Sequence, residues 1–238
     1  MAARPTSVKG IIPRLELDWA ERYGLTAGIT TATGGYSPGP GVPDQWAAFR
    51  QEFQPAFPAT VFGRQVHGRV VRWHDALPKG WVIVDATDGH ATGQPGVLLT
   101  ISVADCTPVY LADPTRGAIA LLHAGWRGTA ARILETGVAL LVERSGSDVS
   151  DIVMHCGVAI CGACYEVGSE VAEALGRSPV SGKTHVDIRA VLARQAAALG
   201  VRRVSVSPLC TAHDPGFHSH RGSKGNGGRM IAYLGRAP

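Results

Sequence analysis

The chain has 238 residues, of which 45% are hydrophobic and 18% are charged, and its formal net charge is +4. This composition excludes a disordered or fibrous chain and predicts a globular protein with a sizeable core. Lys and Arg are scattered along the chain and the apolar runs are short, so neither a nucleic-acid partner nor a membrane span is expected.

The cysteines and the N-terminal segment indicate the cellular compartment. Residues 1–24 lack the continuous apolar stretch of a secretory signal. The chain has five cysteines, and three of them fall within residues 156–164. An odd number of crowded cysteines favours free or metal-bound thiols over a disulfide framework, so a cytoplasmic protein is expected.

The first half of the chain reads as a loop followed by a helix and several strands. Residues 1–43 are rich in turn-forming residues, with a Gly/Pro segment at 30–43 that predicts a surface loop. A short helix is predicted over 44–53. β-Branched residues predict strands within 59–73, with a bend at Gly68, and further strands at 81–87 and 96–103.

The second half contains the clearer helices. Helical spacing of apolar residues predicts a helix from Thr129 to Gly146 and another over 166–176. The clearest helix spans 187–200, with Asp187 as its N-cap and Gly200 at its end. Strands are expected at 151–160 and 201–209, and a basic loop at 217–230. These elements predict one α+β domain over 1–238, with a mixed sheet and flanking helices.

A predicted hairpin brings two chemically active side chains together. The turn "DPTRG" at 113–117 joins two apolar runs that carry Cys106 and His123. If the runs pair about Thr115, these two side chains lie nearly opposite each other, although Pro108 can shift the register by one residue. Such a pair fits a zinc site, a Cys–His nucleophile, or a buried structural pair.

Other candidates are weaker when taken alone. His67 lies beside Gly68 and has no obvious partner. The turn 125–129 before a helix, with Gly128 and Arg127, predicts an anion site, and Arg64, Arg221 and Arg229 are further phosphate candidates. Cys161 and Cys164 form a C-x-x-C motif, but no second C-x-x-C accompanies it, so a second zinc or redox site is not expected.

Several segments together resemble one protein family. The segments "QVHG" (65–68), "ADCTPV" (104–109) and "HAGWRGT" (123–129) resemble the signatures of the YfiH-like, laccase-domain family. The similarity continues through "CYEVGSEV" (164–171) and "CTAHDPGFHSHRGSKGNGGR" (210–229). It covers most of the chain from about residue 28 onward.

The resemblance implies a site and an activity. It implies that His67, Cys106 and His123 coordinate one metal ion, with zinc expected rather than copper, and that the fold is like the catalytic domain of cytotoxic necrotizing factor. It further implies a purine nucleoside phosphorylase, with adenosine deaminase and methylthioadenosine phosphorylase as further activities. The expected partners are a purine nucleoside and phosphate, for a monomer or small homo-oligomer.

Departures from the family pattern leave alternatives open. The family usually has an arginine where this chain has Ala32. The alternatives are a Cys–His amide hydrolase that edits peptidoglycan precursors, a polyphenol oxidase as the family was first described, and a metal-binding protein without activity. Only one H-x-H pair, His218 with His220, is present, which argues against a multicopper oxidase.

Overall fold

A computed structural model describes residues 12–33, 36–37, 43–179 and 181–238 of the chain. Twelve of the strands in these residues form two six-stranded mixed sheets. The predicted surface loop at 30–43 falls largely outside the described residues.

The first sheet has the strand order β1-β2-β14-β7-β3-β5. Its strands are β1 (Arg14–Glu16), β2 (Thr26–Thr30), β14 (Met230–Gly235), β7 (Val97–Val103), β3 (Ala59–Gly63) and β5 (Gly80–Val84). The second sheet has the order β13-β10-β8-β9-β6-β4. Its strands are β13 (Arg203–Val206), β10 (Val153–Cys156), β8 (Thr107–Asp113), β9 (Ala118–Ala124), β6 (Gly89–Thr92) and β4 (Val71–His74). Strands β11 (Glu166–Val167) and β12 (Thr184–His185) pair separately.

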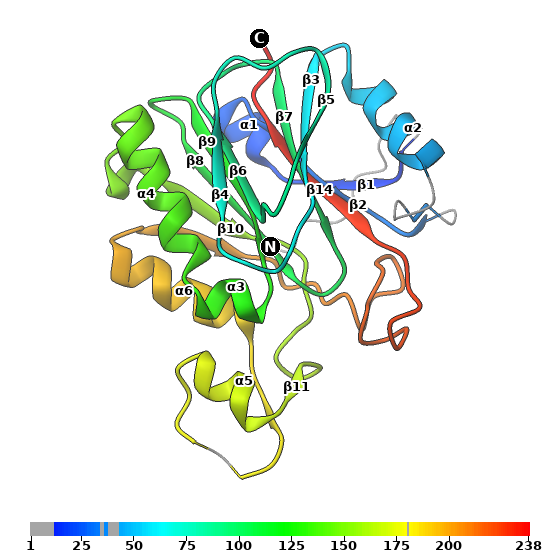
Figure 1. The fold of residues 1–238 in the computed structure, drawn as a ribbon, viewed down its shortest axis with the longest axis vertical. Helices are drawn as coiled ribbons and strands as arrows, with labels where there is room; N and C mark the ends of the chain where they lie inside the picture. The colour runs from blue at the N-terminus through cyan, green and yellow to red at the C-terminus, as the bar shows by residue number, and fades with distance from the viewer. Residues whose placement is uncertain (1–11, 34–35, 38–42, 180) are drawn as a thin grey trace.

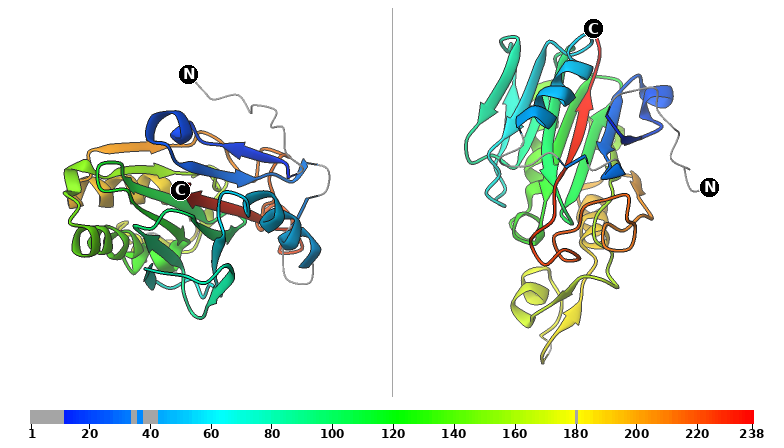
Figure 2. Two further views of the ribbon diagram at one scale, coloured as in Figure 1. Left: turned by 90° about the horizontal axis from the view of Figure 1, so that it is seen from above. Right: turned by 90° about the vertical axis from the view of Figure 1, so that its right-hand side faces the viewer.

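Helices cover the outer faces of the two sheets. The first-sheet side carries α2 (Pro43–Phe53), and the second-sheet side carries α4 (Ile133–Ser145) and α6 (Ile188–Leu199) (Figure 1). Shorter helices are α1 (Trp19–Tyr23), α3 (Trp126–Ala130) and α5 (Ser169–Ala174), with a 3₁₀ turn over Val149–Asp151. Figure 2 shows α5 and its neighbouring strands extending beyond one end of the sheets, at the end where the loop before β14 lies.

Three apolar clusters hold these layers together. One lies between the two sheets and includes Ile101 and Leu121, both fully buried. Another joins the second sheet to α4 and α6, and the third joins the first sheet to α2. Strands buried on both faces explain why β8 and β9 read as continuous apolar runs rather than alternating ones.

The central hairpin is present, but its register differs from the prediction. Strands β8 and β9 pair Thr107 with Ala124 and Pro108 with His123. Cys106 therefore lies in the bend that precedes β8 rather than opposite His123 in the ladder. The register is one residue away from pairing about Thr115, as the sequence analysis allowed at Pro108, and Asp105, with φ 81°, turns the chain at the start of β8. Cys106 and His123 are still near neighbours, since their ligand atoms lie within 4.8 Å of each other.

The helix predicted from Thr129 is two helices. Thr129 lies inside α3, and Arg132, with φ 67° in the left-handed region, separates α3 from α4. The end at Gly146 is confirmed, since Gly146 adopts φ 69° and caps α4. For α6, the Asp187 carboxylate accepts the N–H of Arg189 and Ala190, and Gly200 ends the helix, both as predicted.

The single α+β domain is confirmed, whereas the likeness to cytotoxic necrotizing factor stays a prediction. Within the described ranges, no helix is long and apolar enough to span a membrane.

The sequence prediction missed β1, β2, β6 and β14. Strand β14 follows a Gly-rich basic segment that reads as loop, yet it lies between β2 and β7 within the first sheet.

Candidate metal centre

Three side chains from separate parts of the chain converge at one end of the second sheet. His67 lies in the crossover between β3 and β4, Cys106 lies in the bend before β8, and His123 is the penultimate residue of β9. One ligand atom from each lies within 4.8 Å of the others. The rings of His67 and His123 meet edge to face, with centroids 4.9 Å apart.

A buried carboxylate, that of Asp88, fixes two of these three side chains. Its oxygens accept the backbone N–H groups of Val66, His67 and Gly68 at 3.2, 2.9 and 2.8 Å. These bonds hold His67 at φ 60°, a conformation that is uncommon for a residue with a side chain. Asp88 Oδ1 also lies 3.0 Å from His123 Nδ1, so a proton on Nδ1 leaves Nε2 as the free ring nitrogen.

Strand pairing explains why Asp88 reaches His123. Asp88 immediately precedes β6, and β6 pairs with β9 so that Gly89 faces Leu122. The His123 N–H then donates to the Asp88 carbonyl at 2.7 Å, which continues the ladder by one position. Backbone geometry therefore places this carboxylate beside the imidazole independently of the side-chain bond.

Electrostatics favour the thiolate form of Cys106. Burial acts to raise the pKa of the thiol, but the charge of His123 and hydrogen bonds from His123 and His67 outweigh it and lower the pKa to about 6. For His123, burial acts to lower the pKa, yet the Cys106 thiolate and Asp88 together raise it to about 9. Burial also opposes ionisation of Asp88, whose pKa is nevertheless lowered by its bonds to His123 and the backbone.

The donor set fits a zinc ion. Two imidazoles and a thiolate are ligand types that zinc prefers, and the thiolate is the form that binds metal. Asp88 supplies the outer carboxylate that orients a ligating histidine in zinc sites. Three protein ligands leave one tetrahedral position for a reactant, as in catalytic rather than structural zinc sites.

Gly125 leaves room for the thiolate. A Cβ atom at this position would lie 3.0 Å from Cys106 Sγ and 3.4 Å from His67 Cδ2. Its backbone has φ −79°, which alanine adopts without strain.

We expect Gly125→Ala to lower the zinc affinity of this site by about tenfold, because a ligand atom must shift by tenths of an ångström. Competition with a chromophoric chelator measures this zinc affinity. An unchanged zinc affinity together with an unchanged melting temperature would contradict the prediction.

A cavity of about 450 Å³ opens beside the three ligands. Its volume is within the range of small-molecule sites. Apolar and aromatic walls come from Ile160, Ile188, Trp126 and Tyr165. The cavity is therefore large enough for a small-molecule substrate next to the Cys106 side chain.

Three arginines line the same cavity, namely Arg127, Arg221 and Arg229. The Arg127 guanidinium lies 4.3 Å from the Trp126 ring, and the Arg221 guanidinium lies 5.3 Å from the Tyr165 ring. In the part of the chain that the structure describes, none of the three forms an ion pair with a carboxylate. Their charges therefore remain available to an anionic ligand.

Two of the predicted phosphate residues lie elsewhere. Arg64 is exposed, pairs with Asp85 at 2.5 Å and does not line the cavity. Gly128 is buried, and a Cβ there would lie 2.7 Å from the Gly68 carbonyl, so it serves close packing against the His67 loop. The predicted turn at 125–129 is present as the start of α3, a helix of five residues, and its role as an anion site stays a prediction.

Sequence reasoning missed Asp88 and Asp105. Asp105 accepts the Thr211 hydroxyl at 2.5 Å and the Arg221 N–H at 2.6 Å, which ties the loop before β14 to the residue next to Cys106. Both aspartates bind backbone and side-chain groups of distant segments. No spacing rule connects them to their partners, and the only signal for either is an acidic residue next to a predicted strand.

Comparison with known proteins places this chain in a family. The family model described as multi-copper polyphenol oxidoreductase laccase matches residues 41–237. A Deinococcus radiodurans protein named purine nucleoside phosphorylase is 35% identical over an alignment of 244 positions that covers 94% of each chain. The purine nucleoside phosphorylase YlmD of Bacillus subtilis is 33% identical over 74% of this chain and 70% of its own.

Solved structures agree with the sequence comparison. The crystal structure of YlmD from Geobacillus stearothermophilus matches with a TM-score of 0.86 and 31% identity, over 97% of this chain and 98% of that chain. The Bacillus licheniformis protein YfiH matches with a TM-score of 0.84 and 26% identity, over 98% of this chain and 99% of that chain. The chain therefore belongs to the multi-copper polyphenol oxidoreductase laccase family, the YfiH-like family whose signature segments it carries.

Proposed function

We propose that the protein is a zinc-dependent purine nucleoside phosphorylase. The observation that carries this proposal is the convergence of His67, Cys106 and His123 on a cavity that also presents three arginines without carboxylate partners. The names of the relatives point to the same activity. His67, Cys106 and His123 would hold a zinc ion, which would supply Lewis-acid chemistry beside the cavity.

The protein's own side chains account for binding and orientation. In phosphorolysis, a phosphate oxygen bonds to C1′ of the ribose, and the C1′–N9 bond breaks with its electron pair going to the purine. Arg127, Arg221 and Arg229 hold the phosphate through charge-assisted hydrogen bonds. Trp126 and Tyr165 offer aromatic surfaces to the purine, which takes up a proton as it leaves.

A direct assay tests the proposal. Purified protein is incubated with inosine or adenosine and phosphate, and the free base and ribose 1-phosphate are measured. We expect both products in equal amounts, loss of activity after chelation, and recovery on addition of zinc. Absence of product in protein that contains zinc at the site of His67, Cys106 and His123 would refute the proposal.

Arg127 provides a test of phosphate binding. We expect Arg127→Ala to raise the KM for phosphate by about 10–100-fold, because a hydrogen bond to a charged group contributes about 1.5–3 kcal/mol. The KM for nucleoside should change much less. Arg144→Ala is a matched control, since Arg144 is an exposed arginine that pairs with Asp75 and does not line the cavity. Equal effects of the two substitutions would contradict a phosphate role for Arg127.

One observation favours a second candidate, a Cys–His hydrolase. The arrangement offers Cys106 as a nucleophile, His123 as its base and Asp88 as the carboxylate that orients the base. An amide substrate, such as a peptidoglycan precursor, would then acylate Cys106. Trapping of a covalent adduct on Cys106, with activity that survives chelation, would support the hydrolase and exclude the zinc-dependent reaction.

Two further activities, adenosine deaminase and methylthioadenosine phosphorylase, belong to the same proposal. Deamination of adenosine and phosphorolysis of methylthioadenosine use the same cavity, and a nucleoside panel with ammonia detection separates them. Ala32, where the family usually has arginine, is not among the residues that line the cavity, and its N–H donates to the Gly216 carbonyl at 2.8 Å. Activity is therefore expected despite this departure.

A further inference from the structure

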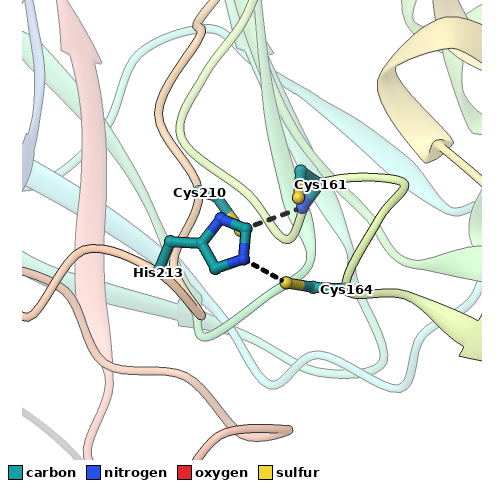
Figure 3. A group of neighbouring side chains, drawn as sticks. All are labelled: Cys161, Cys164, Cys210 and His213. Carbon is teal, nitrogen blue, oxygen red and sulfur yellow. Dashed lines mark hydrogen bonds between the residues drawn. The ribbon is translucent and has the colours of Figure 1, made fainter.

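A second group of potential metal ligands lies outside the site described above. Its members are Cys161, Cys164, Cys210 and His213, hereafter the Cys3His cluster. One ligand atom from each lies within 4.8 Å of every other. Figure 3 shows the four side chains gathered between two loops.

Sheet topology brings the two halves of the cluster together. Strands β10 and β13 are parallel neighbours, with Val153 opposite Arg203. Loops that follow neighbouring parallel strands leave from the same edge of a sheet. Ala159 and Cys210 continue the pairing as an isolated parallel bridge, so the two loops run together up to the cluster.

The two loops form equivalent turns. In the first, the N–H groups of Cys164 and Tyr165 both donate to the Cys161 carbonyl at 3.0 Å. In the second, the N–H groups of His213 and Asp214 donate to the Cys210 carbonyl at 3.2 and 3.0 Å. Each turn thus presents the first and fourth residues of a C-x-x-C or C-x-x-H motif on one side.

Contacts between the turns already link the ligand atoms. The Cys161 N–H donates to Cys210 Sγ at 3.2 Å, and Cys164 Sγ lies 2.9 Å from His213 Nε2 (Figure 3). A tetrahedral zinc ion with Zn–S near 2.3 Å and Zn–N near 2.0 Å spaces its ligand atoms roughly 3.5–3.8 Å apart. The cluster reaches that spacing with small side-chain adjustments.

We propose that the Cys3His cluster binds a zinc ion as a structural site. Three thiolates and one imidazole form a soft, four-coordinate donor set, which is the composition of closed zinc sites. Such a set leaves no position for a reactant, unlike the site at Cys106. The sequence prediction rejected a second zinc site because it sought a second C-x-x-C, whereas the second half is Cys210-x-x-His213.

The position of the cluster assigns it a role. The first loop carries Ile160 and Tyr165, which line the cavity, and the second leads through Thr211 toward Arg221. Thr211 and Arg221 both bond to Asp105, next to Cys106. Zinc in the Cys3His cluster would therefore fix one wall of the cavity by joining the two loops that carry these residues.

Metal analysis tests the proposal independently of the proposed function. The double variant His67→Ala/Cys106→Ala removes the first site, so any zinc that it retains reports the Cys3His cluster alone. We expect it to retain about one zinc per chain, and its Co²⁺ form to show the intense visible absorption of tetrahedral thiolate coordination. Adding Cys161→Ser or His213→Ala to the double variant should abolish stoichiometric retention and that spectrum.

Matched controls exclude a general effect of losing a cysteine or a histidine. Cys156→Ala removes a fully buried cysteine and His185→Asn an exposed histidine, and both residues lie outside the two clusters. In the double-variant background, both should retain zinc. The proposal is overturned if the double variant binds no zinc or Co²⁺, if either control loses zinc as Cys161→Ser does, or if mass spectrometry of freshly purified protein finds a disulfide within the cluster.

Discussion

Cys106→Ala is expected to abolish phosphorolysis and to remove one zinc ion per chain, while the fold remains intact. The side chain contributes the thiolate of the three-ligand set, and alanine offers no donor atom in its place. Removal of an outer-shell partner costs about 10–100-fold in metal affinity or activity, so loss of a direct ligand should cost at least about 100-fold. The bend before β8 depends on backbone geometry rather than on this side chain, so the structure should persist.

Three measurements on the same preparation check this expectation. Elemental analysis gives zinc per chain, product formation gives kcat/KM, and circular dichroism gives the melting temperature. Cys156→Ala is the matched control, because Cys156 is a buried core cysteine of β10 that is not part of the ligand set. Residual activity near that of the unmodified protein in Cys106→Ala would contradict any role for the thiolate, in the phosphorylase and in the hydrolase alike.

Local signals predicted part of this fold well. Helix α6 was predicted to within one residue at each end, because its cap residues Asp187 and Gly200 act on their own neighbours. The hairpin turn was predicted for the same reason, since Asp113 accepts the N–H groups of Thr115 and Arg116. Capping and turn hydrogen bonds between residues that are close in the chain can be predicted from the sequence.

Features that depend on distant segments were not predictable in this way. Strand β14 follows a Gly-rich basic stretch, and only its pairing with β2 and β7 makes it a strand. His67 carries no local sign of a partner, and the family resemblance rather than spacing joined it to Cys106. Asp88 was overlooked for the same physical reason, since its four bonds reach residues 20–35 positions away.

Asp88→Asn is expected to weaken zinc binding at the first site by about 10–100-fold, the usual cost of losing an outer-shell carboxylate. Asparagine keeps the shape of the side chain but replaces one acceptor oxygen with an NH₂ donor. Asp88 Oδ2 accepts the N–H groups of Val66 and Gly68, so an NH₂ group there would face two donors. In the opposite amide orientation it would face His67 N and His123 Nδ1 instead.

The first orientation leaves two part-buried backbone N–H groups without an acceptor. The second leaves the His67 N–H without one and forces the proton off His123 Nδ1. Each unsatisfied group costs about 1–3 kcal/mol, so we expect the free energy of unfolding to fall by about 2–4 kcal/mol and the melting temperature by roughly 4–16 °C. Excess zinc should restore part of the activity, because the three ligands remain, whereas it should not restore Cys106→Ala. That difference separates a residue that orients ligands from one that is a ligand.

Asp85→Asn supplies the comparison for this test. Asp85 lies three positions earlier in the chain, but its carboxylate is exposed and pairs with Arg64 on the surface. Neutralising it removes the same charge without touching the backbone of residues 66–68 or the ring of His123. Zinc affinity and melting temperature should then stay near those of the unmodified protein. If Asp88→Asn behaves like Asp85→Asn, the buried carboxylate does not hold His67 and His123 in place, and the geometry of the centre must have another origin.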